Sequence, residues 1–257
     1  KKYLFMKKNI SVQVLIIALS LLLCACGNEP VKSVLEQNNM RGTIRTVTET
    51  AYLPSSSDTL AFGYRMVFRY DTLGNQTSGT SYDVSDSVIS RAVYTYSGNL
   101  RDVTGTVYNS SGKISAVYRN RYGRNGRLES SSVCQPDGTP DVVYRYEYDS
   151  EGHLSAVYGY DGDKTVISKD VYTGGTPPLT QEHYGPDGIL SVRYGFSHDS
   201  LGNDTSLSIL DGGSNDTVNV IRYSYRYDAN GNWIEKISAS GDDTVSVVRR
   251  SIEYYAE

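Results

Sequence analysis

Few residues of this chain have both the type and the spacing that catalysis requires. Ser110 and Lys113 form an S-x-x-K pair, in which a lysine can activate a serine hydroxyl when both lie at the start of a helix. Here the pair falls in S-S-G-K, whose small residues and glycine are typical of a turn, and no K-T-G motif follows. The sequence therefore predicts a turn at this position and no nucleophile.

The other residues suited to chemistry are three histidines and two acidic segments. His153, His183 and His198 lie in or next to predicted turns without a neighbouring Cys or His, whereas a zinc site needs several ligands close together. Asp211–Asp216 and Gly241–Thr244 are rich in Asp, but neither has the D-x-[DN]-x-[DN]-G spacing of a calcium loop. We expect polar surface residues here, no metal or cofactor, and a protein that is not an enzyme.

The N-terminal residues have the pattern of a secretory signal. Lys7 and Lys8 directly follow the first methionine, Met6, and an apolar run with few interruptions then extends from Ile10 to Leu23. A short basic segment followed by an apolar core is typical of a signal peptide. A membrane-spanning helix needs about 20 apolar residues, so we predict cleavage rather than a permanent helical anchor.

The end of this segment, L-L-C-A-C-G, resembles the lipobox of bacterial lipoproteins. The resemblance implies that residues 1–25 are a signal peptide, that cleavage follows Ala25, and that Cys26 is acylated. Acyl chains anchor a protein because each buried methylene contributes roughly 0.8 kcal/mol. Gly27 follows the cysteine, where an Asp would imply retention in the inner membrane. The resemblance therefore implies a lipid-anchored protein of the outer membrane or cell surface.

Charge and cysteine content restrict the partners and the covalent chemistry. The net charge is −4 and the sequence contains no basic block, so we do not expect a nucleic-acid partner. Cys24 is removed with the signal peptide and Cys26 carries lipid, which leaves Cys134 without a partner for an intrachain disulfide. We interpret Cys134 as a small residue beside a turn.

The composition indicates an all-β protein. The chain has 23 Tyr and 24 Gly but only 4 Phe and 1 Trp; Tyr with Val, Ile and Thr favours strands, and Gly with Asn and Asp favours tight turns. A short helix is predicted only near Val31–Gln37. We therefore expect a tether at residues 26–42 and one β domain at residues 43–257.

Turn sequences of two kinds alternate along the β domain without exception, roughly 13 positions apart. The first series comprises Tyr70–Asn75, Tyr96–Asn99, Tyr122–Arg127, Tyr148–His153, Tyr172–Gly175, His198–Asn203 and Tyr227–Asn232. The second series comprises Ser85–Ser87, Ser110–Lys113, Pro136–Gly138, Gly162–Lys164, Pro186–Gly188, Ser214–Asp216 and Gly241–Asp243. Strict alternation predicts a long antiparallel β-meander with one series at each edge. About 16 strands exceed the ~10 of most open sheets, so we expect a single curled sheet, a spiral or a partial barrel.

Tyrosine recurs at every second position within several predicted strands, for example in Val143–Tyr148 and Arg222–Tyr227. Because side chains alternate between the two faces of a strand, these rings share one face and the charged residues share the other. The rings either pack inside the curved sheet or remain partly open to bind a glycan or a peptide. The candidate ligand-binding residues are Tyr94, Tyr96, Tyr144, Tyr146, Tyr148, Tyr223, Tyr225 and Tyr227.

The first-series turns resemble the YD repeat of the RHS family. Tyr70–Asn75 and Tyr227–Asn232 match Y-D-x-x-G-N completely, while Tyr148–His153 ends in His. Large RHS proteins wind such repeats into a hollow shell around a toxin or peptide, and this chain is too short for that. The resemblance therefore implies the β-meander fold but not encapsulation.

Together these observations predict a non-enzymatic, lipid-anchored envelope or surface protein that acts as a binding or structural module. Its expected partners are the membrane, through the N-terminal lipid, and a glycan or protein ligand. The alternative is a small relative of RHS shells that works with a partner chain in effector delivery or immunity. A third alternative, an enzyme whose site is assembled across strands, has no motif in its favour.

Overall fold

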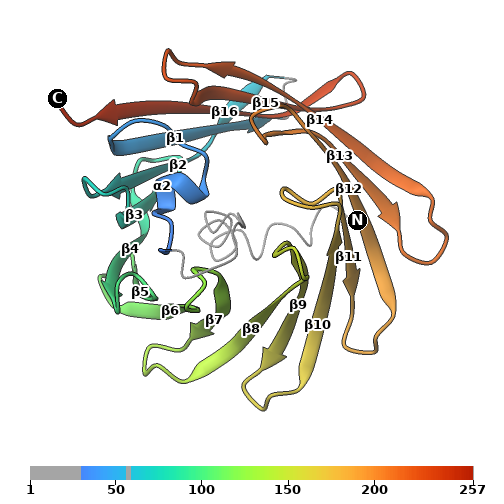
Figure 1. Ribbon diagram of the computed structural model, residues 1–257. Helices are drawn as coiled ribbons and strands as arrows, with labels where there is room; N and C mark the ends of the chain where they lie inside the picture. Colours follow the sequence, from blue (N-terminus) through green and yellow to red (C-terminus); the bar gives the residue numbers. More distant parts are fainter. Residues whose placement is uncertain (1–29, 56–58, 257) are drawn as a thin grey trace.

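The structure is a computed structural model that describes residues 30–55 and 59–256, and it is a single antiparallel barrel (Figure 1). Each strand pairs with the next strand in the chain, and the last strand pairs with the first. The strands are β1 (Ile44–Pro54), β2 (Leu60–Tyr70), β3 (Gln76–Tyr82), β4 (Val88–Ser97), β5 (Asp102–Asn109), β6 (Ile114–Tyr122), β7 (Leu128–Cys134), β8 (Pro140–Tyr148), β9 (Leu154–Asp161), β10 (Val166–Thr173), β11 (Thr180–Tyr184), β12 (Leu190–His198), β13 (Asp204–Asp211), β14 (Thr217–Tyr227), β15 (Trp233–Ser240) and β16 (Asp243–Tyr254). Within these ranges the helix α2 (Val34–Gln37) is the only helix.

The predicted meander is confirmed, and the predicted spiral or partial barrel is wrong because the sheet closes. β1 pairs with β16 from Ile44↔Tyr254 to Tyr52↔Val247. The N–H of Tyr255 extends this pairing by donating to the carbonyl of Thr43 at 2.8 Å. Closure satisfies the backbone groups of both terminal strands, which an open spiral would leave exposed as two unpaired edges.

The two turn series lie at opposite ends of the barrel, as the sequence predicts. Every first-series turn follows an even-numbered strand and every second-series turn follows an odd-numbered one. We call these ends the YD rim and the opposite rim. Because antiparallel strands reverse direction at each turn, this order places each series at one end.

The turns of both rims use the same local chemistry. Asp71 Oδ1 accepts hydrogen bonds from the backbone N–H groups of Leu73 and Asn75, both at 2.9 Å, and Gly74 adopts a φ of 84°. The Asp side chain thus satisfies turn amides, and the glycine takes a conformation that other residues rarely adopt. The equivalent Asp or Asn accepts the same pair of bonds at Asp83, Asn109, Asp149, Asp161, Asp199 and Asp228.

Strand alternation sends the tyrosines of β8 and β14 inward, as predicted. Tyr144 and Tyr146 are half-buried and line a cavity inside the barrel, whereas Arg145 and Glu147 between them are exposed. β14 repeats the arrangement, with Tyr223 inside. The barrel therefore has an aromatic inner face and a charged outer face.

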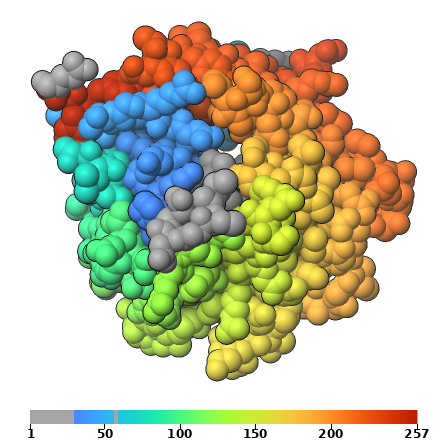
Figure 2. Space-filling model, viewed as in Figure 1, coloured from blue at the N-terminus to red at the C-terminus, as the bar shows by residue number. Residues whose placement is uncertain are grey.

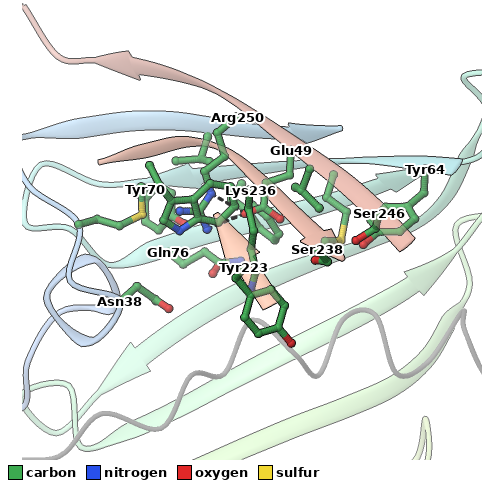
Figure 3. A pocket seen from close by; sticks show the side chains of 16 residues that line it. Asn38, Glu49, Tyr64, Tyr70, Gln76, Tyr223, Lys236, Ser238, Ser246 and Arg250 are labelled. Atoms are coloured by element: carbon green, nitrogen blue, oxygen red, sulfur yellow. Dashed lines mark hydrogen bonds and ion pairs between the residues drawn. The ribbon is translucent and has the colours of Figure 1, made fainter. Parts of the chain in front are cut away.

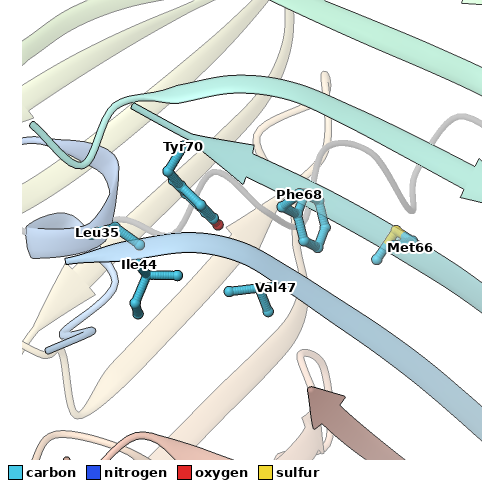
Figure 4. Close-up of a cluster of buried hydrophobic side chains, with 6 residues drawn as sticks. All are labelled: Leu35, Ile44, Val47, Met66, Phe68 and Tyr70. Carbon is cyan, nitrogen blue, oxygen red and sulfur yellow. The ribbon is translucent and has the colours of Figure 1, made fainter. Parts of the chain in front are cut away.

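The densest packing lies beneath α2. A capping box closes the start of this single turn: the Ser33 hydroxyl lies 3.4 Å from the N–H of Glu36, and Glu36 Oε2 accepts from the Ser33 N–H at 2.7 Å. The N–H of Leu35 donates to the carbonyl of Gly74 at 3.1 Å, which fixes α2 to the YD rim. The cluster under the helix consists of Leu35, Ile44, Val47, Met66, Phe68 and Tyr70 (Figure 4). No helix in the described ranges is long and apolar enough to cross a bilayer.

Candidate functional site

The inside of the barrel is here called the lumen, and two cavities on its wall concern the tyrosines. The first, of about 380 Å³, lies between β1–β2 and β14–β16 and is named the Lys236 cavity (Figure 3). The second, of about 300 Å³, lies along β4–β10 and is named the Asp170 cavity. The strands form a closed ring, and in Figure 2 their side chains form a continuous outer surface from the blue through the green to the red part of the chain. These volumes match the lower part of the 300–1,000 Å³ range of ligand pockets.

Several lumen tyrosines are braced by their hydroxyl groups. The hydroxyl of Tyr96 donates to the carbonyl of Gln76 at 2.6 Å, that of Tyr148 to Leu128 at 2.8 Å, and that of Tyr225 to Asp204 at 2.8 Å. In each case the acceptor is the first residue of the neighbouring strand. The bond requires a hydroxyl, which explains Tyr in place of Phe, and it fixes the ring while leaving its faces available.

Burial has an electrostatic effect on these rings. It raises the pKa of Tyr94 to about 12, and the nearby Tyr118 adds to the shift. Burial likewise raises the pKa values of Tyr96 and Tyr148, with further contributions from neighbouring tyrosines. The lumen therefore disfavours an additional negative charge on its own tyrosines, which remain neutral hydroxyl groups at neutral pH.

Two tyrosines at the YD rim connect successive turns instead of lining a cavity. The Tyr227 hydroxyl donates to Asp199 Oδ2 at 2.9 Å, and the Tyr254 hydroxyl donates to Asp228 Oδ2 at 2.6 Å. Each bond joins the end of one strand to the preceding first-series turn. The Tyr and the Asp of the Y-D motif therefore hold the rim together.

The eight tyrosines predicted as a ligand platform all belong to inner-facing strand positions, but they do not form one site. Tyr146 also bonds to the Ser131 hydroxyl, with the two oxygens 2.9 Å apart. Tyr94, Tyr144 and Tyr146 line the Asp170 cavity, Tyr223 lines the Lys236 cavity, Tyr94 and Tyr96 line a smaller space beneath α2, and Tyr148, Tyr225 and Tyr227 are held by the hydrogen bonds above.

The charged residues of the lumen were missed by the sequence analysis. Glu49 Oε1 lies 2.7 Å from Arg250 Nη2, and both side chains are largely buried. The face of Trp233 lies against the same guanidinium, with Cζ 3.3 Å from the ring centroid. A signal was present, because Glu49 alternates with Val47 and Ala51 on the apolar face of its strand.

The histidines differ from the prediction of polar surface residues at two of three positions. His183 lies in β11, opposite Asp170, and its Nδ1 is 2.8 Å from Asp170 Oδ1. The side chain of His198 is only 10% exposed and its Nε2 lies 3.1 Å from Asp204 Oδ1. His153 alone is a turn residue, beside Asp149. Each of the two strand histidines is therefore paired with a carboxylate in the barrel wall, which the prediction of polar surface residues did not include.

This Asp–His pair does not by itself form a catalytic site. Asp170 Oδ1 also accepts from Gln181 Nε2 at 2.9 Å. The Ser191 hydroxyl donates to the backbone carbonyl of His183 at 3.0 Å, but in the part of the chain that the structure describes no Ser, Thr or Cys is hydrogen-bonded to its imidazole, so an activated nucleophile is missing. Nor do residues 30–55 and 59–256 contain a group of three or more His, Cys, Asp or Glu that could hold a metal.

The two cysteines of the predicted mature chain are Cys26 and Cys134. Cys26, the expected lipidation site, lies outside the described residues. Cys134 is a free, buried thiol that accepts from Arg119 Nη1 at 3.6 Å and lies 3.5 Å from the Ser132 hydroxyl. Its burial fits a packing role.

Comparison with known proteins identifies the barrel fold but no family. No family model matches this sequence, and no curated protein matches it. Among solved structures, a porin-like protein from Bacteroides uniformis has a TM-score of 0.57 at 11% identity, over 88% of this chain and 100% of that chain. A porin-like protein from Bacteroides vulgatus has a TM-score of 0.43 at 10% identity, over 84% and 100%. A LolA superfamily protein from Nitrosomonas europaea has a TM-score of 0.30 at 12% identity, over 87% and 92%.

Proposed function

We propose that this chain is a non-enzymatic, lipid-anchored envelope protein whose barrel binds a small apolar ligand in its lumen. The observation that carries the proposal is the inner face itself. Tyr223 lines the cavity of about 380 Å³, and Tyr94 and Tyr146 line the cavity of about 300 Å³. The tyrosines two positions further along the same strands, Tyr225, Tyr96 and Tyr148, are fixed by hydrogen bonds of their hydroxyl groups. Rigid aromatic walls with a few polar groups are typical of small-molecule sites.

The outer face supports a barrel surrounded by water. Arg145, Glu147, Arg222 and Arg226 are exposed in the middle or the later part of their strands. Barrels that span a bilayer present apolar residues outward, and an outward Arg at the midplane costs about 2–4 kcal/mol. The present barrel has the reverse alternation, which favours attachment through lipid on Cys26 at the outer membrane or cell surface.

Relation to the RHS family, and with it the alternative of a partner chain, remains a proposal based on the Y-D turns. Their Asp and Gly have a local explanation, because Asp71 and Asp228 satisfy turn amides and Gly74 and Gly231 take a positive φ. Such turns suit any hairpin of this geometry. We therefore place the ligand-binding lumen first.

A neutral hydrophobic fluorophore, phenylnaphthylamine, tests the binding proposal. Its fluorescence should rise on binding to the wild-type barrel. Ser246→Trp places an indole in the Lys236 cavity, which Ser246 lines, and should weaken binding at least about tenfold (~1.4 kcal/mol). Ser251→Trp on the same strand is the control, because Ser251 is exposed on the outer face. Equal affinities of the two variants would contradict a lumen site.

The anchor is tested separately. Cys26→Ser should release the protein from the membrane fraction or leave an unprocessed precursor, because the acylated thioether is removed. Fractionation and immunoblotting of both forms measure the effect. Unchanged size with unchanged membrane retention would contradict lipid anchoring without affecting the binding proposal.

A further inference from the structure

The Lys236 cavity contains a cation that has no anionic partner. Lys236 lies on β15 with its Nζ 4.1 Å from the ring centroid of Tyr223 and 5.7 Å from that of Tyr225. Within residues 30–55 and 59–256, no carboxylate lies within ion-pair distance of it. An aromatic face attracts a cation but does not accept its N–H groups as an oxygen would. A buried ammonium group in this position therefore keeps donors that a ligand can use.

The acidic residues whose charge acts on Lys236 have other partners. Asp204 is 3.1 Å from His198, and Glu49 is 2.7 Å from Arg250. Burial lowers the pKa of Lys236, and the charge of Asp204 offsets part of that effect. The Glu49–Arg250 pair is neutral overall, which leaves one net positive charge on the cavity wall.

A second donor without a partner lies in the wall of the same cavity. Gln76 lines the Lys236 cavity and is 5% exposed, and its side-chain Nε2 has no hydrogen-bond partner in the described part of the chain. A buried N–H group without a partner costs about 1–3 kcal/mol. Figure 3 shows Gln76, Lys236 and Tyr223 reaching toward the cavity from three different strands.

We propose that the Lys236 cavity selects a monoanionic ligand with a planar apolar body, such as an aromatic carboxylate or sulfonate. The ammonium group of Lys236 binds the anion, and the amide of Gln76 supplies a further hydrogen bond. The ring faces of Tyr223 and Trp233 contact the apolar body. This inference rests on the proposed function, since it names the ligand class for the same lumen.

Two fluorophores with one ring system separate charge from shape. Anilinonaphthalene sulfonate is an anion, and phenylnaphthylamine lacks the sulfonate. Wild-type protein should bind the anion more tightly. Lys236→Met should weaken anion binding at least about tenfold, because a charge-assisted hydrogen bond is lost, and should change the affinity for the neutral probe less than about twofold. Lys236→Arg should restore most of the anion affinity.

The matched control is Lys169→Met. Lys169 also lies over tyrosine rings, at 5.4 Å from Tyr158 and 5.9 Å from Tyr184, but on the outer face. This variant should bind both probes as the wild type does, and urea unfolding confirms that each variant is folded.

Each outcome decides between the two proposals. Undiminished anion binding by Lys236→Met, or equal loss of both probes, overturns the inference while leaving neutral binding in the lumen intact. Failure of both probes to bind the wild type overturns the proposed function, and the inference with it.

Discussion

The barrel has two sectors with the same repeat pattern and different interiors. In the sector of β1–β4, closed by α2, Ile44, Val47 and Phe68 are buried to 7% exposure or less. In the sector of β10–β14 no hydrophobic residue in the described structure reaches this burial, and the inward residues are half-buried. The two sectors have the same alternation of side chains and the same kinds of turn. Their difference in burial therefore arises from what packs against their inner faces.

The Lys236 cavity lies where a packed part of the barrel meets a loosely packed one. Apolar area removed from water stabilises by roughly 25 cal/mol per Å², and the buried residues of β1–β4 have removed most of theirs. Val47 and Phe68 of this packed sector line one part of the cavity, and Tyr223 of β14 lines another. We therefore expect substitutions on the β14 side to affect binding with a smaller loss of stability than substitutions in β1 and β2.

A pair of phenylalanines tests the contrast most strongly. Phe68→Ala should lower the free energy of unfolding by about 3–5 kcal/mol, because it leaves a cavity in packed surroundings. Phe196→Ala, on the inner face of β12, should cost about 1–2 kcal/mol, since Phe196 is only half-buried beside Tyr194 and His198. Urea unfolding measures both, and equal losses would show that the two sectors are packed alike.

Alkaline pH should also distinguish Tyr94, whose pKa is raised strongly, from Tyr223, whose pKa is raised less. The pKa of Tyr94 is about 12 in the fold and about 10 in an unfolded chain. The folded state therefore binds more protons than the unfolded state between pH 10 and 12. The neutral Tyr94 hydroxyl contributes its full share to the free energy of unfolding below pH 10, and about 2–3 kcal/mol of it is lost as the pH rises to 12. Tyr94→Phe should reduce this loss of stability more than Tyr223→Phe, as followed by urea unfolding at each pH.

Substitution of the last residue of two first-series turns should have a smaller effect. Asn232 accepts from the N–H of Arg41 and donates to its carbonyl, both at 2.8 Å, and is 3% exposed. Asn232→Ala leaves both backbone groups without a partner and should cost about 2 kcal/mol. Asn203, at the same turn position, bonds to Asp199 and Tyr227 and is less buried. Asn203→Ala should cost less than about 1 kcal/mol. Thermal unfolding measures both variants, and a larger loss of stability for Asn203→Ala than for Asn232→Ala would contradict this prediction.

Local features of the fold could be predicted because each depends on a few neighbouring residues. The Asp and Gly of each turn satisfy local backbone groups, and the alternation of Tyr with Arg, as in Tyr144–Arg145–Tyr146, determines the inner face. The number of strands and the two rims follow from those turns. These predictions required no contact between distant parts of the chain.

Closure and the charges of the lumen could not be predicted in the same way. Closure depends on β1 meeting β16, and neither strand differs in alternation from an edge strand. The Glu49–Arg250 pair joins residues about 200 positions apart. The role of Lys236 likewise depends on which side chains surround it in the folded barrel. The candidate site is therefore a product of long-range pairing, while the tyrosines that surround it were visible in the sequence.

The smallest expected effect concerns the cap of α2, which tests whether the helix itself stabilises the packed sector. Hydrogen bonds from the Ser33 hydroxyl and backbone N–H lower the pKa of Glu36 below its usual 4.5. A carboxyl group with a lowered pKa stabilises the fold above that unfolded value, and the contribution disappears as the pH falls through the folded pKa. Because Glu36 is exposed, Glu36→Gln should cost only ~0.5 kcal/mol near neutral pH. The difference between wild type and variant should shrink as the pH falls below 4.5, whereas Glu147→Gln on the exposed outer face should show no such pH-dependent difference. A Glu36→Gln cost that does not change with pH would mean that the carboxylate does not act through the cap, and that the contacts of Leu35 hold α2 over the core.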